Sequence, residues 1–92
     1  MISIWSVYLI RFGSGSLYTG ISTDVERRFE EHSSAGIKAA KSIRGKGPLQ
    51  LEFSVEVGDR SKATSLEIKV KKLSRQDKES LVAGELSIFD LK

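Results

Sequence analysis

Five side chains with the chemistry needed to break a phosphodiester bond occur along this chain of 92 residues. A tyrosine or histidine can accept a proton, an arginine can hold phosphate oxygens with its planar fork, and a glutamate can bind a hard metal ion. Hydrolysis of a phosphodiester needs these functions at one place. The candidate catalytic residues are Tyr8, Tyr18, Arg28, His32 and Glu67.

The two tyrosines are expected on neighbouring strands of a hairpin. The run Ile4–Phe12 is rich in aromatic and β-branched residues, and Leu17–Ser22 is a second run of the same kind. A short glycine and serine link such as Gly13-Ser14-Gly15-Ser16 between two such runs is typical of a hairpin loop. Tyr8 and Tyr18 are therefore expected side by side.

The arginine and the histidine are expected on a helix that follows the hairpin. Thr23 and Glu26 form a capping box, which predicts a helix over residues 24–33. Arg28 and His32 lie one turn apart on this helix and border its apolar stripe. Their side chains should therefore be neighbours on the face that meets the sheet or its edge.

Each of these residues also has a purely structural interpretation. Tyrosines commonly fill small cores, Gly20 could be only a strand end or a bulge, and Arg28 could be a surface cation. His32 near a helix C-terminus could be favoured there by the helix dipole when protonated. Arg27 points away from the apolar stripe and is expected to pair with Glu31 on the surface.

Glu67 is expected on the apolar face of a second helix. Residues 49–57 alternate between apolar and polar side chains, which predicts a half-buried third strand, and Asp59 or Ser61 then caps the helix. Two interpretations of Glu67 stay open: it pairs with Lys71 at i+4, or it binds a metal ion. One carboxylate with waters and a substrate phosphate suits Mg²⁺, whereas a chain with one histidine and no cysteine is a poor zinc ligand.

The C-terminal part is expected to complete the core. Ser74 and Asp77 repeat the capping signature, which predicts a last short helix that ends near Gly84. Residues 86–91 alternate weakly and are expected to cover an edge of the core. The predicted fold is an α/β sandwich, in which a small three-stranded, mainly antiparallel sheet is flanked by helices.

Composition limits the class of protein. With 39% apolar residues the chain can build one core, so we expect one domain over residues 1–92, with a core at about 4–84 and a tail at 85–92. The absence of cysteine excludes disulfides and thiolate metal sites and is compatible with a reducing compartment. There is no membrane-spanning apolar run, and Met1–Trp5 does not resemble a signal peptide. A cytoplasmic protein without membrane association is the expectation.

Cations gather in one segment of the chain. The net charge is only +3, but no acid occurs between Glu31 and Glu52, and residues 36–44 are expected to form one or two helical turns before an exposed Gly-Lys-Gly-Pro turn. Such a segment could follow a phosphate backbone, although it could equally be a solvated loop. The candidate nucleic-acid-binding residues are Lys38, Lys41, Arg44 and Lys46.

The complete set of residues resembles the GIY-YIG nuclease superfamily. Ser6-Val7-Tyr8 stands in place of the first family tripeptide and Tyr18-Thr19-Gly20 in place of the second. Arg28 matches the helix arginine of the family, His32 a position that is His or Tyr in different branches, and Glu67 the metal-binding glutamate. The resemblance spans roughly residues 4–75 and is greatest to small stand-alone bacterial members. In some members a lysine follows the second motif, where this chain has Ile21.

The resemblance implies a divalent-metal-dependent endonuclease that cuts DNA, with a role in DNA repair or recombination. Tyr8 is then the general base, Tyr18 and His32 orient the water or the Tyr8 hydroxyl, and Arg28 holds the scissile phosphate. Glu67 would bind Mg²⁺ or Mn²⁺, and the products would carry a 5′-phosphate and a 3′-hydroxyl. Family nucleases generally use attached domains or partner subunits to find their targets, so a protein partner that supplies specificity is also expected.

Two other classes of function stay open. A non-catalytic nucleic-acid-binding module would show salt-sensitive binding without a metal requirement. An interaction module would use Trp5 or the apolar C-terminal tail to meet a protein partner, although packing in the core or at the sheet edge is the more common role of such a tryptophan.

Overall fold

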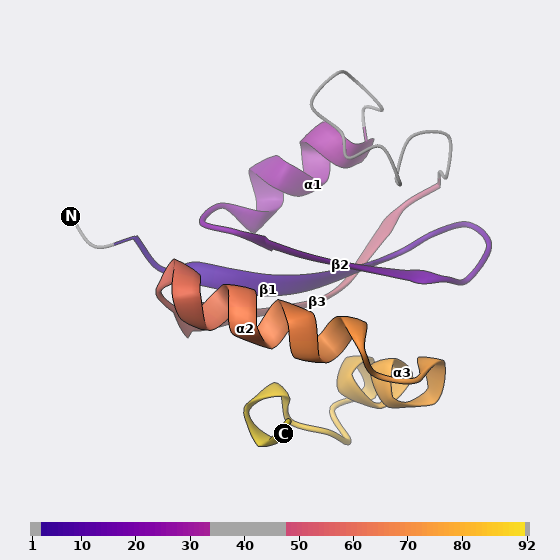
Figure 1. Ribbon diagram of the computed structural model, residues 1–92. Coiled ribbons are helices and arrows are strands. Elements are labelled where there is room, and N and C mark those ends of the chain that lie inside the picture. Colours follow the sequence, from indigo (N-terminus) through magenta and orange to yellow (C-terminus); the bar gives the residue numbers. More distant parts are fainter. Residues whose placement is uncertain (1–2, 34–47, 92) are drawn as a thin grey trace.

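The computed structural model of the chain describes residues 3–33 and 48–91. The cations predicted to bind nucleic acid, residues 38–46, and the helical turns expected at 36–44 lie outside the described residues. Strands and helices follow one another in the order shown in Figure 1. Their bounds are β1 (Trp5–Arg11), β2 (Leu17–Ser22), α1 (Val25–Ser33), β3 (Gln50–Gly58), α2 (Arg60–Lys71), α3 (Arg75–Ala83) and the 3₁₀ helix η1 (Ile88–Asp90).

The strands form one antiparallel sheet in the order β2-β1-β3. In its register Tyr8 lies opposite Gly20, and Ile10 lies opposite Tyr18. Helix α1 covers one face of the sheet, whereas α2, α3 and η1 lie on the other face (Figure 1). The predicted α/β sandwich with a three-stranded antiparallel sheet is therefore confirmed. No helix in the described part of the chain is long and apolar enough to cross a lipid bilayer.

The central strand β1 supplies side chains to both layers of the core. Val7 and Leu9 point toward α2 and α3, while Tyr8 and Ile10 point toward α1, as the period of two in a strand requires. All four side chains are at most 2% exposed. Because both faces of β1 are covered by helices, its apolar run is continuous rather than alternating.

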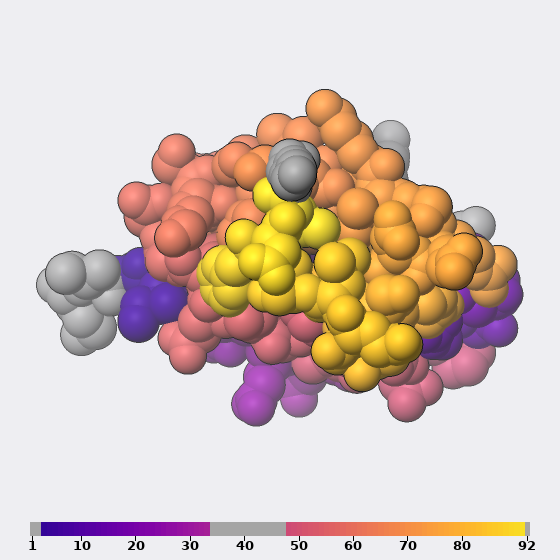
Figure 2. All heavy atoms as spheres, turned by 90° about the horizontal axis from the view of Figure 1, so that it is seen from below, coloured from indigo at the N-terminus to yellow at the C-terminus, as the bar shows by residue number. Residues whose placement is uncertain are grey.

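The C-terminal segment covers the core as expected. Ile88 of η1 is buried in the cluster formed with α2 and α3. Seen from below in Figure 2, this segment (yellow) lies between α2 and α3 and covers the underside of the molecule. The weakly alternating tail therefore completes the larger of the two apolar clusters.

Helix caps follow the sequence signals with one correction. Asp59 caps α2, since its carboxylate accepts a hydrogen bond from the Lys62 backbone N–H at 2.8 Å, and Ser74 caps α3 in the same way. Helix α1, however, is capped by Asp24 rather than by Thr23: the Asp24 Oδ1 accepts from the Arg27 N–H at 3.2 Å. The backbone N–H of Asp24 is itself bound to the Ser22 hydroxyl oxygen, which starts the helix one residue later.

Arg11, at the end of β1, connects elements that are distant in sequence. Its guanidinium donates two hydrogen bonds to the Glu79 carboxylate of α3, at 2.8 and 2.6 Å, and one to Glu52 of β3 at 3.2 Å. A further hydrogen bond, at 3.0 Å, goes to the Gly15 carbonyl in the β1–β2 turn. This fork fixes α3 against the sheet near the turn that precedes Tyr18.

We predict that Arg11→Ala lowers the free energy of unfolding more than Arg27→Ala, which removes an exposed arginine. The hydrogen bonds from Arg11 hold the pKa of Glu79 below its ordinary value, so this stabilisation is present above the ordinary carboxyl pKa and is lost as the pH falls through the depressed one. Urea unfolding at neutral and acid pH measures both effects. An unchanged difference between wild type and Arg11→Ala at low pH would contradict the assignment.

Candidate active site

The five candidate residues meet at the β2 edge of the sheet, where α1 and α2 both contact β2. Tyr8 comes from β1, Tyr18 from β2, Arg28 and His32 from α1, and Glu67 from α2. Tyr8, Tyr18 and Gly20 share the face of the sheet that α1 covers, because they occupy matching positions in the β1–β2 register. The fold thus brings together residues spread over most of the sequence.

Tyr8 and His32 form the buried centre of the cluster. The Tyr8 Oη lies 3.1 Å from the His32 Nε2, and the two residues are only 2% and 1% exposed. The Tyr18 ring stands edge-on to His32 with 5.6 Å between ring centroids, and it lies 6.5 Å from the Tyr8 ring. Tyr18 is less buried than either partner. It therefore lies on the more exposed side of the hydrogen-bonded pair.

Gly20 is required by the position of the Tyr8 ring. A Cβ atom at this position would lie 2.5 Å from the Tyr8 Cζ and against the hydroxyl oxygen. The backbone of Gly20 is not in the left-handed region, so close packing rather than chain conformation demands glycine here. The presence of glycine at position 20 was the only signal of this contact in the sequence. The interpretations of Gly20 as a bulge or a strand end do not account for the need for glycine.

Burial keeps Tyr8 neutral in this site. Burial is the largest cause that raises the pKa of Tyr8 to about 12; the neighbouring Tyr18 and, more weakly, Glu67 act in the same direction. The Arg28 guanidinium opposes them, since it lies close enough to the hydroxyl to favour the phenolate by its charge and as a hydrogen-bond donor. At neutral pH Tyr8 is consequently a phenol.

His32 is neutral as well. Burial, and then the positive charge of Arg28, lower the pKa of His32 from its ordinary value, although Glu31 acts in the opposite direction. A buried neutral imidazole does not fit the interpretation of His32 as a protonated residue stabilised by the helix dipole. Arginine can only donate to the Tyr8 oxygen, so the Tyr8 hydroxyl is free to donate its proton to the His32 Nε2 in the tautomer that leaves this nitrogen unprotonated.

Arg28 forms an ion pair with Glu31, which was expected to pair with Arg27. The Arg28 Nη1 lies 3.0 Å from the Glu31 Oε1, so Glu31 pairs with Arg28 and not with Arg27 as expected. The pKa of Arg28 is raised: burial works against its charge, but Glu31 and Tyr8 outweigh this. Both i,i+3 and i,i+4 partners are within reach on a helix. Packing of α1 on the sheet favours the i,i+3 pair of Arg28 with Glu31.

Glu67 satisfies parts of both interpretations left open for it. Its Oε2 lies 3.6 Å from the Lys71 Nζ, as the structural interpretation expects. The carboxylate is also close enough to Tyr8 to raise the pKa of that phenol, and its side chain is 19% exposed. It therefore faces the cluster from the rim.

The donor set at this rim fits a magnesium-like ion. Among residues 3–33 and 48–91 no group of three or more His, Asp or Glu side chains could enclose a metal. A single carboxylate that remains open to solvent leaves the other positions to water and substrate, which is the coordination that Mg²⁺ accepts. Of the candidate residues that the structure describes, Glu67 is the one carboxylate at this rim that could serve as such a ligand.

Trp5 has a structural role in the described part of the chain. It packs against the larger apolar cluster, and the Arg60 guanidinium lies over its ring at 5.5 Å from the centroid. This agrees with packing in the core or at the sheet edge.

We predict that Gly20→Ala lowers the free energy of unfolding by about 1–3 kcal/mol, the usual cost of overpacking a core. The new Cβ must displace the Tyr8 ring and with it the contact to His32. Denaturant unfolding measures the loss, with Gly13→Ala in the exposed turn as the control. Equal stabilities of the two variants would contradict the close packing.

The single histidine of the chain allows a direct titration. We predict that the NMR signals of the His32 ring titrate with a pKa below the ordinary value of about 6.5, because burial and Arg28 disfavour the imidazolium. Arg28→Ala should move the pKa upward. A wild-type pKa at or above the ordinary value would show that His32 is not buried as described.

Comparison with known proteins identifies the family of the chain. The family model described as the GIY-YIG catalytic domain matches residues 4–80. A UPF0213 protein of Klebsiella pneumoniae is 57% identical over 81 residues, which cover 88% of this chain and 74% of the relative. A UPF0213 protein of Photorhabdus laumondii is 58% identical, covering 85% and 73%.

A solved structure supports the same assignment. The solution NMR structure of a UPF0213 protein from Bacillus halodurans is 40% identical and superposes with a TM-score of 0.56, covering 89% of this chain and 85% of that one. The family match takes in both tyrosine motifs, the α1 arginine and histidine, and the α2 glutamate. This chain belongs to the GIY-YIG family.

Proposed function

We propose that the protein is a divalent-metal-dependent endonuclease that hydrolyses phosphodiester bonds of DNA. The observation that carries the proposal is the hydrogen-bonded Tyr8–His32 pair, 3.1 Å apart, with Tyr18, Arg28 and Glu67 around it. Membership of a family whose model is named as a catalytic domain supports the same reaction class.

The buried pair provides a path for the proton of the attacking water. With a pKa of about 12, Tyr8 does not hold a stable phenolate at neutral pH. It can, however, accept the proton of the water as it passes its own proton to the neutral His32 Nε2. The water oxygen forms a bond to phosphorus as the bond to the 3′-oxygen breaks, and the 3′-oxygen takes a proton from solvent, which leaves a 3′-hydroxyl and a 5′-phosphate. His32 then returns the proton that it accepted to solvent.

Arg28 is suited to bind the phosphoryl oxygens. Its guanidinium is partly exposed, at 31%, while Glu31 holds it from one side at 3.0 Å. A planar fork oriented in this way can meet the charge that grows on phosphate oxygens in the transition state. Tyr18, edge-on to His32, keeps the imidazole aligned with the Tyr8 hydroxyl.

Glu67 would hold the metal ion. A Mg²⁺ or Mn²⁺ ion held by this carboxylate would supply positive charge that stabilises the phosphoryl group and the leaving oxygen. Lys71 now balances the Glu67 carboxylate, so metal binding and this ion pair compete for the same oxygens. DNA repair or recombination is the pathway we propose, with a partner protein supplying target choice.

We predict that labelled single-stranded, duplex or branched DNA is cut in the presence of Mg²⁺ or Mn²⁺. Tyr8→Phe, Arg28→Ala and Glu67→Ala should each lower the rate at least about 100-fold, the range typical of lost proton transfer or charge stabilisation. Arg27→Ala, one residue from Arg28 but exposed, should retain activity. Circular dichroism would establish that each variant is folded.

The control outcomes separate the alternatives. Full activity of Glu67→Ala would remove the metal site from the proposal. Absence of cutting on every substrate, together with binding that weakens as salt rises, would instead identify a non-catalytic nucleic-acid-binding module. Absence of both would favour an interaction module.

A further inference from the structure

The helices α2 and α3 carry much of the positive charge in the described part of the chain. Residues 60–78 contain seven cations and only two acids. Such an imbalance has a functional meaning only if the cations gather on one surface, so their directions around the helices decide the question.

The cations of α2 lie on two different flanks of its buried face. That face is formed by Ala63, Leu66 and Val70. With 3.6 residues per turn, Lys71 lies on the same flank as Glu67, and the 3.6 Å ion pair agrees with this placement. Lys62 and Lys69 lie on the opposite flank and have no place near the candidate site.

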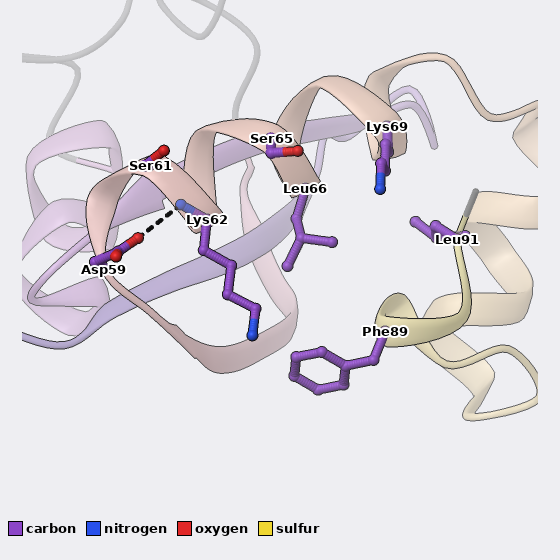
Figure 3. Close-up of a pocket in the computed structure, with 8 residues that line it drawn as sticks. All are labelled: Asp59, Ser61, Lys62, Ser65, Leu66, Lys69, Phe89 and Leu91. Carbon is purple, nitrogen blue, oxygen red and sulfur yellow. Dashed lines mark hydrogen bonds between the residues drawn. The ribbon is translucent and has the colours of Figure 1, made fainter.

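The opposite flank forms a separate cavity. Figure 3 shows the side chains of Lys62, Leu66 and Lys69 extending from α2 toward Phe89 and Leu91 of the C-terminal segment. The cavity has a volume of about 630 Å³ and lies on the layer of the molecule away from α1. Lys62 and Lys69 in this cavity carry two positive charges away from the candidate site, so they can serve as a control.

The start of α3 lies beside the β1–β2 turn. Arg75 and Lys78 line a small pocket of about 190 Å³ together with Ser16 and Leu17. A Cβ at Gly15 would lie 3.2 Å from the Arg75 Nη2, so the guanidinium rests against the β1–β2 turn. Figure 1 shows this turn at the same end of the molecule as the α2–α3 junction. Leu17 directly precedes Tyr18 of the candidate site.

The charges of Arg75 and Lys78 are available to a ligand. Both oxygens of the nearby Glu79 carboxylate accept hydrogen bonds from Arg11. Within residues 3–33 and 48–91, no carboxylate lies within ion-pairing distance of Arg75 or Lys78. Among the described residues, the lining of this pocket therefore holds two cations and no acidic side chain, while the charge of Arg75 still acts at longer range on Glu79 and helps to lower its pKa.

We propose that Lys71, Arg75 and Lys78 form a phosphate-binding track along the β2 edge for the nucleic-acid strand that passes through the candidate site. The substrate class rests on the proposed function. Phosphates next to the scissile one would meet Lys71, once it leaves Glu67, and then the Arg75 fork and the Lys78 ammonium. Because these contacts reach only the backbone, the track adds affinity and register without sequence preference.

Binding without metal tests the track independently of catalysis. Anisotropy of a fluorescent single-stranded oligonucleotide, measured in EDTA, would compare the wild type with the double variant Arg75→Ala/Lys78→Ala. The matched control is Lys62→Ala/Lys69→Ala, which removes the same charge from the opposite flank of α2. We expect roughly a tenfold weaker affinity in the track variant, and a salt slope that is smaller by about 1.4, since each cation removed from a single strand accounts for about 0.7.

The outcomes are separable from those of the cleavage experiment. Equal losses in the two double variants would show only a long-range charge effect and would overturn the track, as would undiminished binding in the track variant or no binding by the wild type. A protein that cuts nothing but loses binding selectively in the track variant would keep the track and lose the nuclease. Arg75→Lys/Lys78→Arg should retain most of the affinity, because both charges remain.

Discussion

The position of the Tyr8 ring is the constraint on which the rest of the site depends. The ring stands on the central strand, packs onto the bare backbone of Gly20 and reaches His32 across the layer between sheet and α1. A side chain at residue 20 would push the ring away from β2, and the hydroxyl would lose its imidazole partner. The glycine in edge strand β2 thus fixes how closely the Tyr8 ring of β1 can lie to β2 and to His32 of α1.

Burial sorts the site into a neutral interior and a charged rim. The Tyr8–His32 pair is nearly inaccessible, and burial moves the pKa of the phenol up and that of the imidazole down, so both are uncharged at neutral pH. Arg28 and Glu67 remain partly exposed, and each is balanced by a neighbour on its own helix. Both charged groups are therefore accessible from solvent. A phosphate could replace Glu31 at Arg28, and a cation could replace Lys71 at Glu67.

The edge position of β2 explains why residues from both layers can cooperate. Helix α1 lies on one face of the sheet and α2 on the other, and only at an edge can side chains from the two faces approach each other. The Arg11 fork to Glu79 fixes α3 near the turn that begins β2. The same arrangement also places Arg75 and Lys78 beside the start of this strand, where they line a small pocket with Ser16 and Leu17.

Local signals in the sequence were sufficient for the elements: the strand periods, the hairpin link, and the caps Asp59 and Ser74 each depend on residues close in the chain. Family resemblance pointed to the five candidate residues, but their mutual geometry is decided by contacts between residues up to 59 positions apart in the numbering, such as Tyr8 and Glu67. Tertiary packing gave Glu31 to Arg28 and made Gly20 obligatory, whereas a local hydrogen bond from the Asp24 N–H to the Ser22 hydroxyl accompanies the choice of Asp24 as the α1 cap. Sequence spacing offers several partners of nearly equal energy, and only the position of α1 and α2 on the sheet decides between them.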